Sequence, residues 1–191
     1  MLKRFPLLLI FIATILTLVI AFKQTAQAPA PLNTEDATDT RPSWQAFNMT
    51  SWHLSNASEN PTQTRIHADQ ITYQNTERLS HFKAPFVIRD EPQQRMTLES
   101  DSGFSENDTR VTLEKNIVIH RFDKANPNEI STLNTEKITY NSETGLLYSP
   151  LFTQITQPNT IISGVGFEAD LTTDTYRFLS QVKTQYQPNQ D

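Results

Sequence analysis

The stretch from residue 66 to residue 88, IHADQITYQNTERLSHFKAPFVI, decides the fold, because two alternating apolar runs are joined in it by a polar turn. The first run contains Ile66 and Ala68, and the second contains Phe82 and Phe86. Alternation with a period of two residues is typical of a half-buried β-strand. The stretch therefore predicts an antiparallel pair of strands.

Three further stretches repeat this pattern, at residues 98–119, 133–155 and 162–184. In each unit an apolar residue leads, and a small residue follows two positions later. The four lead-and-small pairs are Ile66 and Ala68, Leu98 and Ser100, Leu133 and Thr135, and Ile162 and Gly164. Repetition roughly every 30 residues is the signature of stacked units that cover one another's apolar faces. The sequence thus predicts an all-β fold of stacked antiparallel strand pairs, which two facing sheets would turn into a jellyroll or a long open sandwich.

Alternation also assigns faces within the units, and proline and glycine mark their irregularities. In the first unit, one face of the second strand is predicted to carry Phe82, Ala84, Phe86 and Ile88. Pro85 and Pro150 occupy equivalent places in their units and predict a strand entry, a bulge or an edge. Gly164 and Gly166 predict a sharp bend or a close approach of backbones.

Composition narrows the class of protein. The 191 residues carry a net charge of -5 without a basic stripe, which argues against a nucleic-acid-binding protein. The chain has no cysteine, and this excludes thiol catalysis, thiolate metal sites and disulfide bonds. The length leaves room for one domain, predicted at residues 44–186, with an N-terminal appendage and a disordered polar tail at residues 187–191.

The N-terminal appendage has the features of a membrane anchor. Residues 1–4 include Lys3 and Arg4, residues 5–22 are almost entirely apolar, and residues 23–43 are rich in proline, alanine and acidic residues. An apolar helix over 5–22 would cover about 27 Å, close to the thickness of a bilayer core. The positive-inside rule then places residues 1–4 in the cytoplasm and the domain across the membrane, with a flexible linker between span and domain.

The alternative for this segment is a cleaved signal peptide, because Ala26 and Ala28 form a small-x-small cleavage pattern. The apolar run is longer than the core of a usual signal peptide, and Pro29 would stand directly after the cut. We therefore predict an uncleaved single span. Cleavage would leave a soluble protein with the same domain.

No catalytic or metal-binding constellation is visible in the sequence. The four histidines lack the spacing of metal ligands, and His67 with Asp69 lacks a third ligand, so a surface pair is the simpler interpretation. Paired acids fall at turns or on solvent faces rather than opposite one another in a cleft. The sequence predicts no enzyme, no cofactor and no metal site. A β-sandwich hydrolase that uses one acid pair is the least favoured alternative.

The remaining candidate site is the apolar inner face of the predicted sheets. An incompletely closed slot between two sheets suits acyl chains, because each buried CH2 group contributes about 0.8 kcal/mol. The alternative is an ordinary closed core. The predicted groove residues are Phe82, Phe86, Ile88, Phe104, Leu113, Ile117, Phe152, Phe167, Tyr176, Phe178 and Val182.

Two stretches carry a resemblance to a known family, at residues 65–88 and 162–186. The second, ISGVGFEADLTTDTYRFLSQVKTQY, resembles the closing pattern of the LptC family, which is a glycine-bearing strand, an acidic turn and a last strand ending in V-x-T-x-Y. This family is the bitopic inner-membrane component of the lipopolysaccharide transport bridge. The length, the single N-terminal span and the order of the repeated units resemble the family as well.

The resemblance implies a fold, a location and partners. The fold would be an open, twisted β-jellyroll in the periplasm, preceded by one transmembrane helix in the inner membrane. The domain would receive lipopolysaccharide from LptF, in the transporter of LptB, LptF and LptG, and pass it to LptA, while ATP hydrolysis would occur in LptB. Phe82 carries over as a groove residue and Tyr176 only as a position. A glycine of the family is absent near Gln157.

The two sheet edges would be the junctions with these partners, because unpaired strand edges invite strand addition. The N-terminal edge and the membrane helix would meet LptF and LptG with LptB, and the C-terminal edge would meet LptA. An alternative function is a membrane-anchored periplasmic scaffold or assembly factor with a closed core. The residues assigned to the edges are Phe47, Trp52, Gly164, Phe178 and Val182.

Overall fold

The computed structural model describes residues 43–55, 62–75, 77–107, 109–126, 130–141, 143–170, 173 and 175–186. Eleven β-strands and the turns between them account for nearly all of these residues. The strands are β1 (Trp44–Ser55), β2 (Thr62–Gln74), β3 (Leu79–Lys83), β4 (Phe86–Asp90), β5 (Gln94–Glu99), β6 (Ser102–Glu106), β7 (Arg110–Asp123), β8 (Ile130–Asn141), β9 (Leu146–Gln157), β10 (Thr160–Asp170) and β11 (Thr175–Tyr186).

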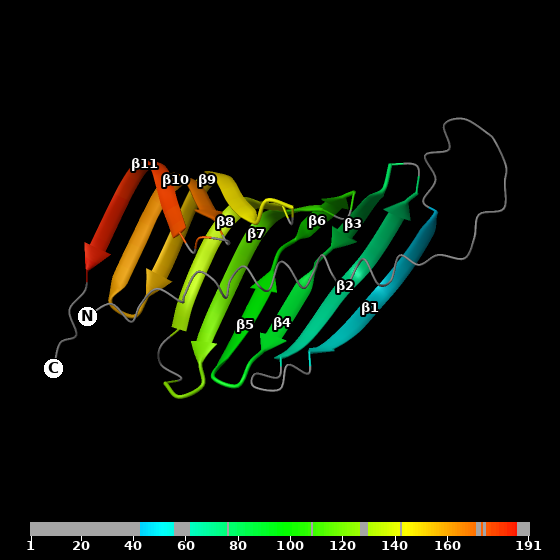
Figure 1. Ribbon diagram of the computed structural model, residues 1–191, viewed down its shortest axis with the longest axis horizontal. Helices are drawn as coiled ribbons and strands as arrows, with labels where there is room; N and C mark the ends of the chain where they lie inside the picture. Colours follow the sequence, from blue (N-terminus) through cyan, green and yellow to red (C-terminus); the bar gives the residue numbers. More distant parts are fainter. Residues whose placement is uncertain are drawn as a thin grey trace.

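All strands belong to one antiparallel sheet. β3 and β4 lie one after the other along the same side of β2, and β6 and β5 share one side of β7 in the same way. Each of these two pairs therefore acts as one long strand that is interrupted in its middle. The sheet is an up-and-down succession that runs from β1 at one end to β11 at the other (Figure 1).

A corner crosses the middle of every long strand and folds the sheet into two layers. The upper layer contains β3 and β6, and the lower layer contains β4 and β5 (Figure 1), while the other strands run through both. Bulges bend strands, and here they shift the register of the β7–β8, β8–β9, β9–β10 and β10–β11 pairs. Positive φ angles accompany the corner at Asn48, Ala84, Lys115, Asn116, Gly166 and Gln181.

Hydrogen bonds at the corner satisfy backbone groups that the interruptions release from the ladder. The backbone N–H of Ala84 donates to the carbonyl of Asp101 (2.8 Å), and that of Asp101 donates to the carbonyl of Lys115 (3.0 Å). The amide of Asn116 donates to the Asp101 carboxylate at 2.8 Å. Polar residues at these positions of the repeat therefore stabilise the bend.

The predicted all-β, antiparallel architecture is confirmed, and each repeat unit corresponds to two neighbouring long strands of the sheet. The small residues that follow the lead residues are all buried beside the corner; they are Ala68, Ser100, Thr135 and Gly164. Pro85 separates β3 from β4, and Pro150 stands at the register shift of β9, as the interpretation of a bulge requires.

The prediction that Phe82, Ala84, Phe86 and Ile88 share one face is wrong. Ala84 adopts a φ of 47° in the interruption between β3 and β4, and the alternation shifts there by one residue. Phe82 is 3% exposed, whereas the residue of β4 that enters the core is Val87, at 0% exposure. Phe86 and Ile88 point to the outer face.

The predicted cytoplasmic end, membrane span and C-terminal tail lie outside the described residues, as does all but the last residue of the predicted linker. Among the residues that the structure describes, no helix is long and apolar enough to cross a membrane.

The substitution Gly103→Ala is expected to lower the free energy of unfolding by about 1–3 kcal/mol, more than Gly164→Ala does. A Cβ at Gly103 would lie 2.9 Å from the backbone oxygen of Thr112, which the β6–β7 ladder holds in place. A Cβ at Gly164 would lie 2.8 Å from Cδ1 and 3.0 Å from Cβ of Phe178, but Phe178 belongs to the end strand β11, which is paired on one side only and can shift. Urea unfolding of both variants measures the difference, and equal losses would contradict this order.

Candidate functional site

The lower layer presents a continuous row of aliphatic side chains to the space between the layers, which we call the interior. Cross-strand pairing places its members side by side from β2 to β10, over roughly 30 Å at about 4.8 Å per strand. We call this row the aliphatic ladder. It consists of Ile66, Val87, Leu98, Ile119, Leu133, Ile155 and Ile162. All except the partly exposed Ile162 are at most 5% exposed, so the ladder forms an unbroken apolar surface.

The upper layer faces the ladder with larger side chains. One row, near the corner, contains Ile71, Phe82, Gly103, Leu113, Ile138, Phe167 and Phe178. A second row, nearer the turns, contains Trp44, Tyr73, Val111, Tyr140, Leu147, Ala169 and Tyr176, with serines between its members. The rings of Trp44 and Tyr73 stack at 5.7 Å. Most of these residues form one hydrophobic cluster with the ladder.

On the inner face of the lower layer, the row of residues between the aliphatic ladder and the turns is largely polar. Cross-strand pairing aligns the members of this row, which we call the lower lip: Thr64, Arg89, Met96, Arg121 and Ser131. An apolar ladder bordered by arginines is an amphipathic surface, apolar in its depth and cationic at its rim.

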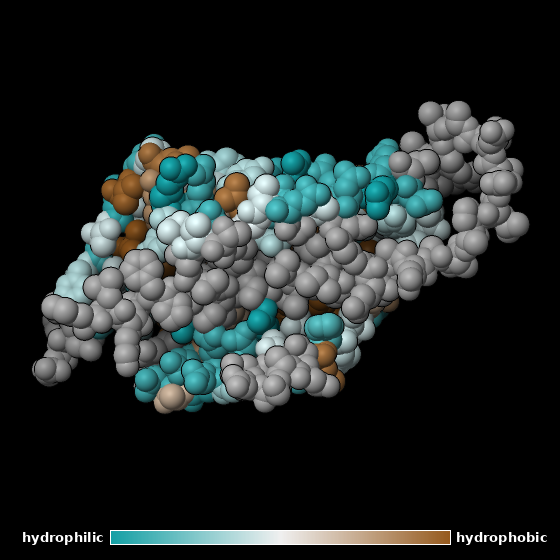
Figure 2. Space-filling view, in the orientation of Figure 1, coloured by the Kyte–Doolittle hydropathy of each residue, from teal (hydrophilic) through white to brown (hydrophobic). Residues whose placement is uncertain are grey.

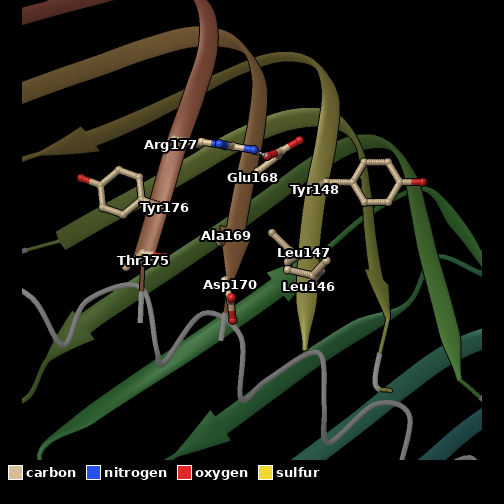
Figure 3. A pocket seen from close by; sticks show the side chains of 9 residues that line it. All are labelled: Leu146, Leu147, Tyr148, Glu168, Ala169, Asp170, Thr175, Tyr176 and Arg177. Atoms are coloured by element: carbon tan, nitrogen blue, oxygen red, sulfur yellow. Dashed lines mark hydrogen bonds and ion pairs between the residues drawn. The ribbon is translucent and has the colours of Figure 1, made fainter. Parts of the chain in front are cut away.

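The interior opens to solvent at the β11 end. Tyr176 faces inward from β11 and is 42% exposed, while Phe167 beneath it is 1% exposed at a ring distance of 6.1 Å. A separate hollow of about 590 Å³ lies on the outer face of the same strands, because most of its lining residues alternate along β9, β10 and β11 with the inward-facing Leu147, Ala169 and Tyr176. The ion pair of Arg177 with Glu168 crosses this hollow (Figure 3). Its lining consists of Leu146, Leu147, Tyr148, Glu168, Ala169, Asp170, Thr175, Tyr176 and Arg177.

Exposed apolar side chains gather at this same end of the molecule. In Figure 2 most of the brown residues lie over β9 to β11, and the other described residues of that face are mainly hydrophilic. The outer edges of β1 and β11 pair with no strand of the described residues. The exposed large residues of β9 and β11 are Leu146, Tyr148, Leu151, Phe152, Tyr176, Leu179, Val182 and Tyr186.

The structure brings seven of the predicted groove residues to the interior or its open end. Leu113, Ile117 and Phe167 are each 1% exposed, as deeply placed as Phe82. Phe178 is half-buried against the core, with its ring 5.3 Å from that of Phe167. Tyr176 and Val182 belong to the last strand and are exposed.

The other four predicted groove residues point outward. Phe86 and Ile88 do so because of the interruption before β4. Phe104 lies between two buried residues of β6, so its ring faces outward and packs 6.2 Å from the ring of His81. Phe152 follows the bulge of β9 and is 55% exposed, while the next residue, Thr153, enters the interior.

The predicted edge residues are placed as follows. Phe47 and Trp52 are exposed on β1, and Arg65 lies over the Trp52 ring at 5.4 Å. Gly164 is buried in β10, one strand inside the edge, while Phe178 and Val182 belong to the edge strand itself.

Sequence reasoning missed the aliphatic ladder as a unit, and it missed the arginines of the lower lip. A signal for the ladder was present, because the four lead residues of the repeat are themselves members of it. No comparable signal marked Arg89 and Arg121, because the alternation that faces them inward follows an interruption in one case and a bulge in the other.

The titratable residues singled out in the sequence form a surface pair. Nε2 of His67 lies 3.7 Å from Oδ1 of Asp69, and both side chains are more than a third exposed. Within the described ranges, no three histidine, aspartate or glutamate side chains are grouped so that they could hold a metal ion.

Comparison with known proteins identifies a family that the chain matches. The chain matches the family model described as "Lipopolysaccharide-assembly, LptC-related" over residues 7–187. Among solved structures it is similar to LptH of Pseudomonas aeruginosa, described as the LptA-homologous periplasmic component of the lipopolysaccharide transport device. That likeness has a TM-score of 0.47 and 12% identity and covers 65% of this chain and 95% of LptH. No curated protein sequence matches the chain significantly.

Proposed function

Because the chain belongs to the LptC-related family of lipopolysaccharide-assembly proteins, we propose that its interior carries the acyl chains of lipopolysaccharide. The family is a component of a transport bridge and is not known as an enzyme family. The single observation that supports a conduit most directly is the aliphatic ladder, which continues in register from β2 to β10. An acyl chain that moves along it exchanges one apolar contact for another and avoids the cost of about 0.8 kcal/mol for each CH2 group exposed to water.

In this proposal the two free edges of the sheet are the entry and exit junctions. The β11 edge joins LptA, because its exposed inner face would continue into a strand added beside it. The β1 edge meets LptF and LptG of the transporter, and LptB supplies ATP hydrolysis. Lipopolysaccharide is received at the β1 end and passed on at the β11 end.

The proposed location follows from the N-terminal sequence. Residues 5–22 anchor the chain in the inner membrane as a single span, with residues 1–4 in the cytoplasm and the β-domain in the periplasm. Residues 23–43 then link the span to Trp44, where β1 begins.

A second candidate function is a membrane-anchored scaffold with an ordinary closed core. The low exposure of the ladder favours this candidate, since Val87 and Leu98 are both 0% exposed. Under this alternative the edges would still bind partners, but no lipid would enter between the layers.

Site-specific photocrosslinking distinguishes the two candidates. We expect a photoreactive residue at Tyr176 to form ATP-dependent adducts with lipopolysaccharide in membranes that contain the transporter. The same residue at the neighbouring Arg177, which is exposed on the outer face, should not. Phe82 and the outward-facing Lys83 form a second matched pair. A folded, partner-bound protein that gives no adduct at Tyr176 or Phe82 would refute the conduit and favour the scaffold.

A further inference from the structure

The lower lip borders the aliphatic ladder along the turns of the lower layer. Arg89 and Arg121 both pair with Met96 across the sheet, and their side chains share the inner face with Val87 and Ile119 of the ladder. Residues two apart on a strand are separated by about 7 Å. A molecule whose acyl chains lie on the ladder would therefore hold its polar headgroup at the height of these arginines.

Both guanidinium groups are oriented by the turn that joins β4 to β5. Nε of Arg89 donates to Oε1 of Glu91 at 2.6 Å, and Nε of Arg121 donates to Oε1 of Gln94 at 2.8 Å. The amide of Gln94 donates in turn to Oε2 of Glu91 at 2.7 Å. The Arg89 side chain is only 17% exposed. Charged hydrogen bonds are strongest for groups that are held in place and partly removed from water.

Thr64, in the same row as the two arginines, has a buried hydroxyl group that independently indicates a binding site. It pairs with Arg89 across β2 and β4 and is 1% exposed, and its Oγ1 finds no hydrogen-bond partner among the described residues. A buried hydroxyl without a partner is unfavourable. An oxygen-rich anion bound between Thr64 and Arg89 would accept a hydrogen bond from each.

The charges around the lip favour an anion. On the outer face Asp90 pairs with Arg95 and with Lys124. Burial raises the pKa of Asp90, but hydrogen bonds from Lys124 and Arg95 outweigh this effect and lower the pKa, so the carboxylate stays ionised and bound to these cations. Glu91 accepts hydrogen bonds from Arg89 and from the side-chain amide of Gln94, and Gln94 in turn accepts one from Arg121, so both arginines of the lower lip are oriented by this turn.

We propose that the lower lip binds a phosphate group on the headgroup of the amphiphile whose acyl chains occupy the aliphatic ladder. The planar fork of an arginine matches two oxygens of a phosphate, and Thr64 adds a neutral donor. Bound in this way, the phosphate fixes how deeply the lipid enters the interior. The inference rests on the proposed function, and it adds the chemical class of headgroup that the interior accepts.

The test compares lipopolysaccharide with its enzymatically dephosphorylated form, using the full chain in membranes with the transporter. Photoreactive residues at Met96 and Tyr176 report the lip and the open end separately. We expect the double variant Arg89→Gln and Arg121→Gln to reduce the preference for the phosphorylated lipid by about tenfold. Arg95→Gln is the matched control, because Arg95 precedes Met96 on the opposite face, and it should keep the full preference. The double variant Arg89→Lys and Arg121→Lys keeps the positive charges but not the planar fork, so it should keep only part of the preference.

Each outcome of this test either supports or refutes the phosphate site at the lower lip. An unchanged preference in the folded glutamine double variant, with normal adducts at Tyr176, would overturn the phosphate site and leave the conduit intact. Absence of lipid adducts at both Met96 and Tyr176 would overturn the conduit and the site together. Inorganic phosphate should compete only in large excess over the lipid. If it suppressed the Met96 adduct equally for both lipid forms and without excess, the lip would be a site for the free ion and the headgroup assignment would be wrong.

Discussion

Replacing Phe167 by alanine is expected to lower the free energy of unfolding by about 3–5 kcal/mol, the largest effect of any substitution considered for this protein. The side chain is 1% exposed, and its ring lies 5.3 Å from that of Phe178 and 6.1 Å from that of Tyr176. Truncation removes these contacts and leaves a cavity. The sheet cannot close this cavity, because the hydrogen bonds between neighbouring strands hold the backbone in place. Urea unfolding followed by tryptophan fluorescence measures the loss.

Phe152→Ala is the matched control for this prediction. Phe152 is the same residue type and was predicted to line the same groove, but it is 55% exposed on the outer face. Its truncation should change the free energy of unfolding by no more than about 0.5 kcal/mol. Comparable losses at Phe152 and Phe167 would show that the assignment of inner and outer faces in β9 and β10 is incorrect.

The substitution Phe178→Glu is expected to reduce the transfer of lipopolysaccharide to LptA by at least about tenfold, if the interior carries acyl chains as proposed. Phe178 is half-buried at the open end, above Gly164 and beside Phe167. A carboxylate at this point would retain its hydration and break the apolar surface where the lipid leaves. Crosslinking of lipopolysaccharide to LptA in reconstituted membranes measures the transfer.

Leu179→Glu serves as the control for Phe178→Glu. Leu179 is the next residue of the same strand, lies over Gly166 on the outer side of the corner and is 58% exposed. A charge there meets water on the folded protein, so transfer should be close to that of the wild type. Normal transfer by a folded Phe178→Glu protein would argue against passage of acyl chains along the inner face of β11.

The repeat in the sequence was sufficient to predict the succession of strand pairs. Its lead residues are apolar because they form the aliphatic ladder, and its small residues recur because each stands beside the corner. Gly164 shows the reason, since a Cβ there would come within 2.8 Å of the Phe178 ring. The sequence predicts such positions because the same packing recurs in each unit along the sheet and requires the same kind of residue each time.

The individual faces beyond the corner were less predictable. Alternation assigns a face only while the strand is regular, and one extra or interrupted residue reverses or shifts it. Ala84 has a positive φ although it is not glycine, and Lys115 and Asn116 do the same in β7. Alanine and lysine seldom adopt a positive φ, so neither Ala84 nor Lys115 indicates a bulge by its residue type. For this reason Phe86 and Ile88 were assigned to the wrong face, while Phe82, before the interruption, was placed inside.

The up-and-down order of the strands has a consequence for how the domain folds. Each long strand pairs only with the long strands that precede and follow it in the chain, so no pairing joins distant parts of the sequence. Closing short loops costs little conformational entropy, and a linear array of this kind can begin to form at any hairpin and grow in both directions. Stability is then distributed along the array, and the two end strands, each supported from one side, are the first to exchange their hydrogen bonds with solvent.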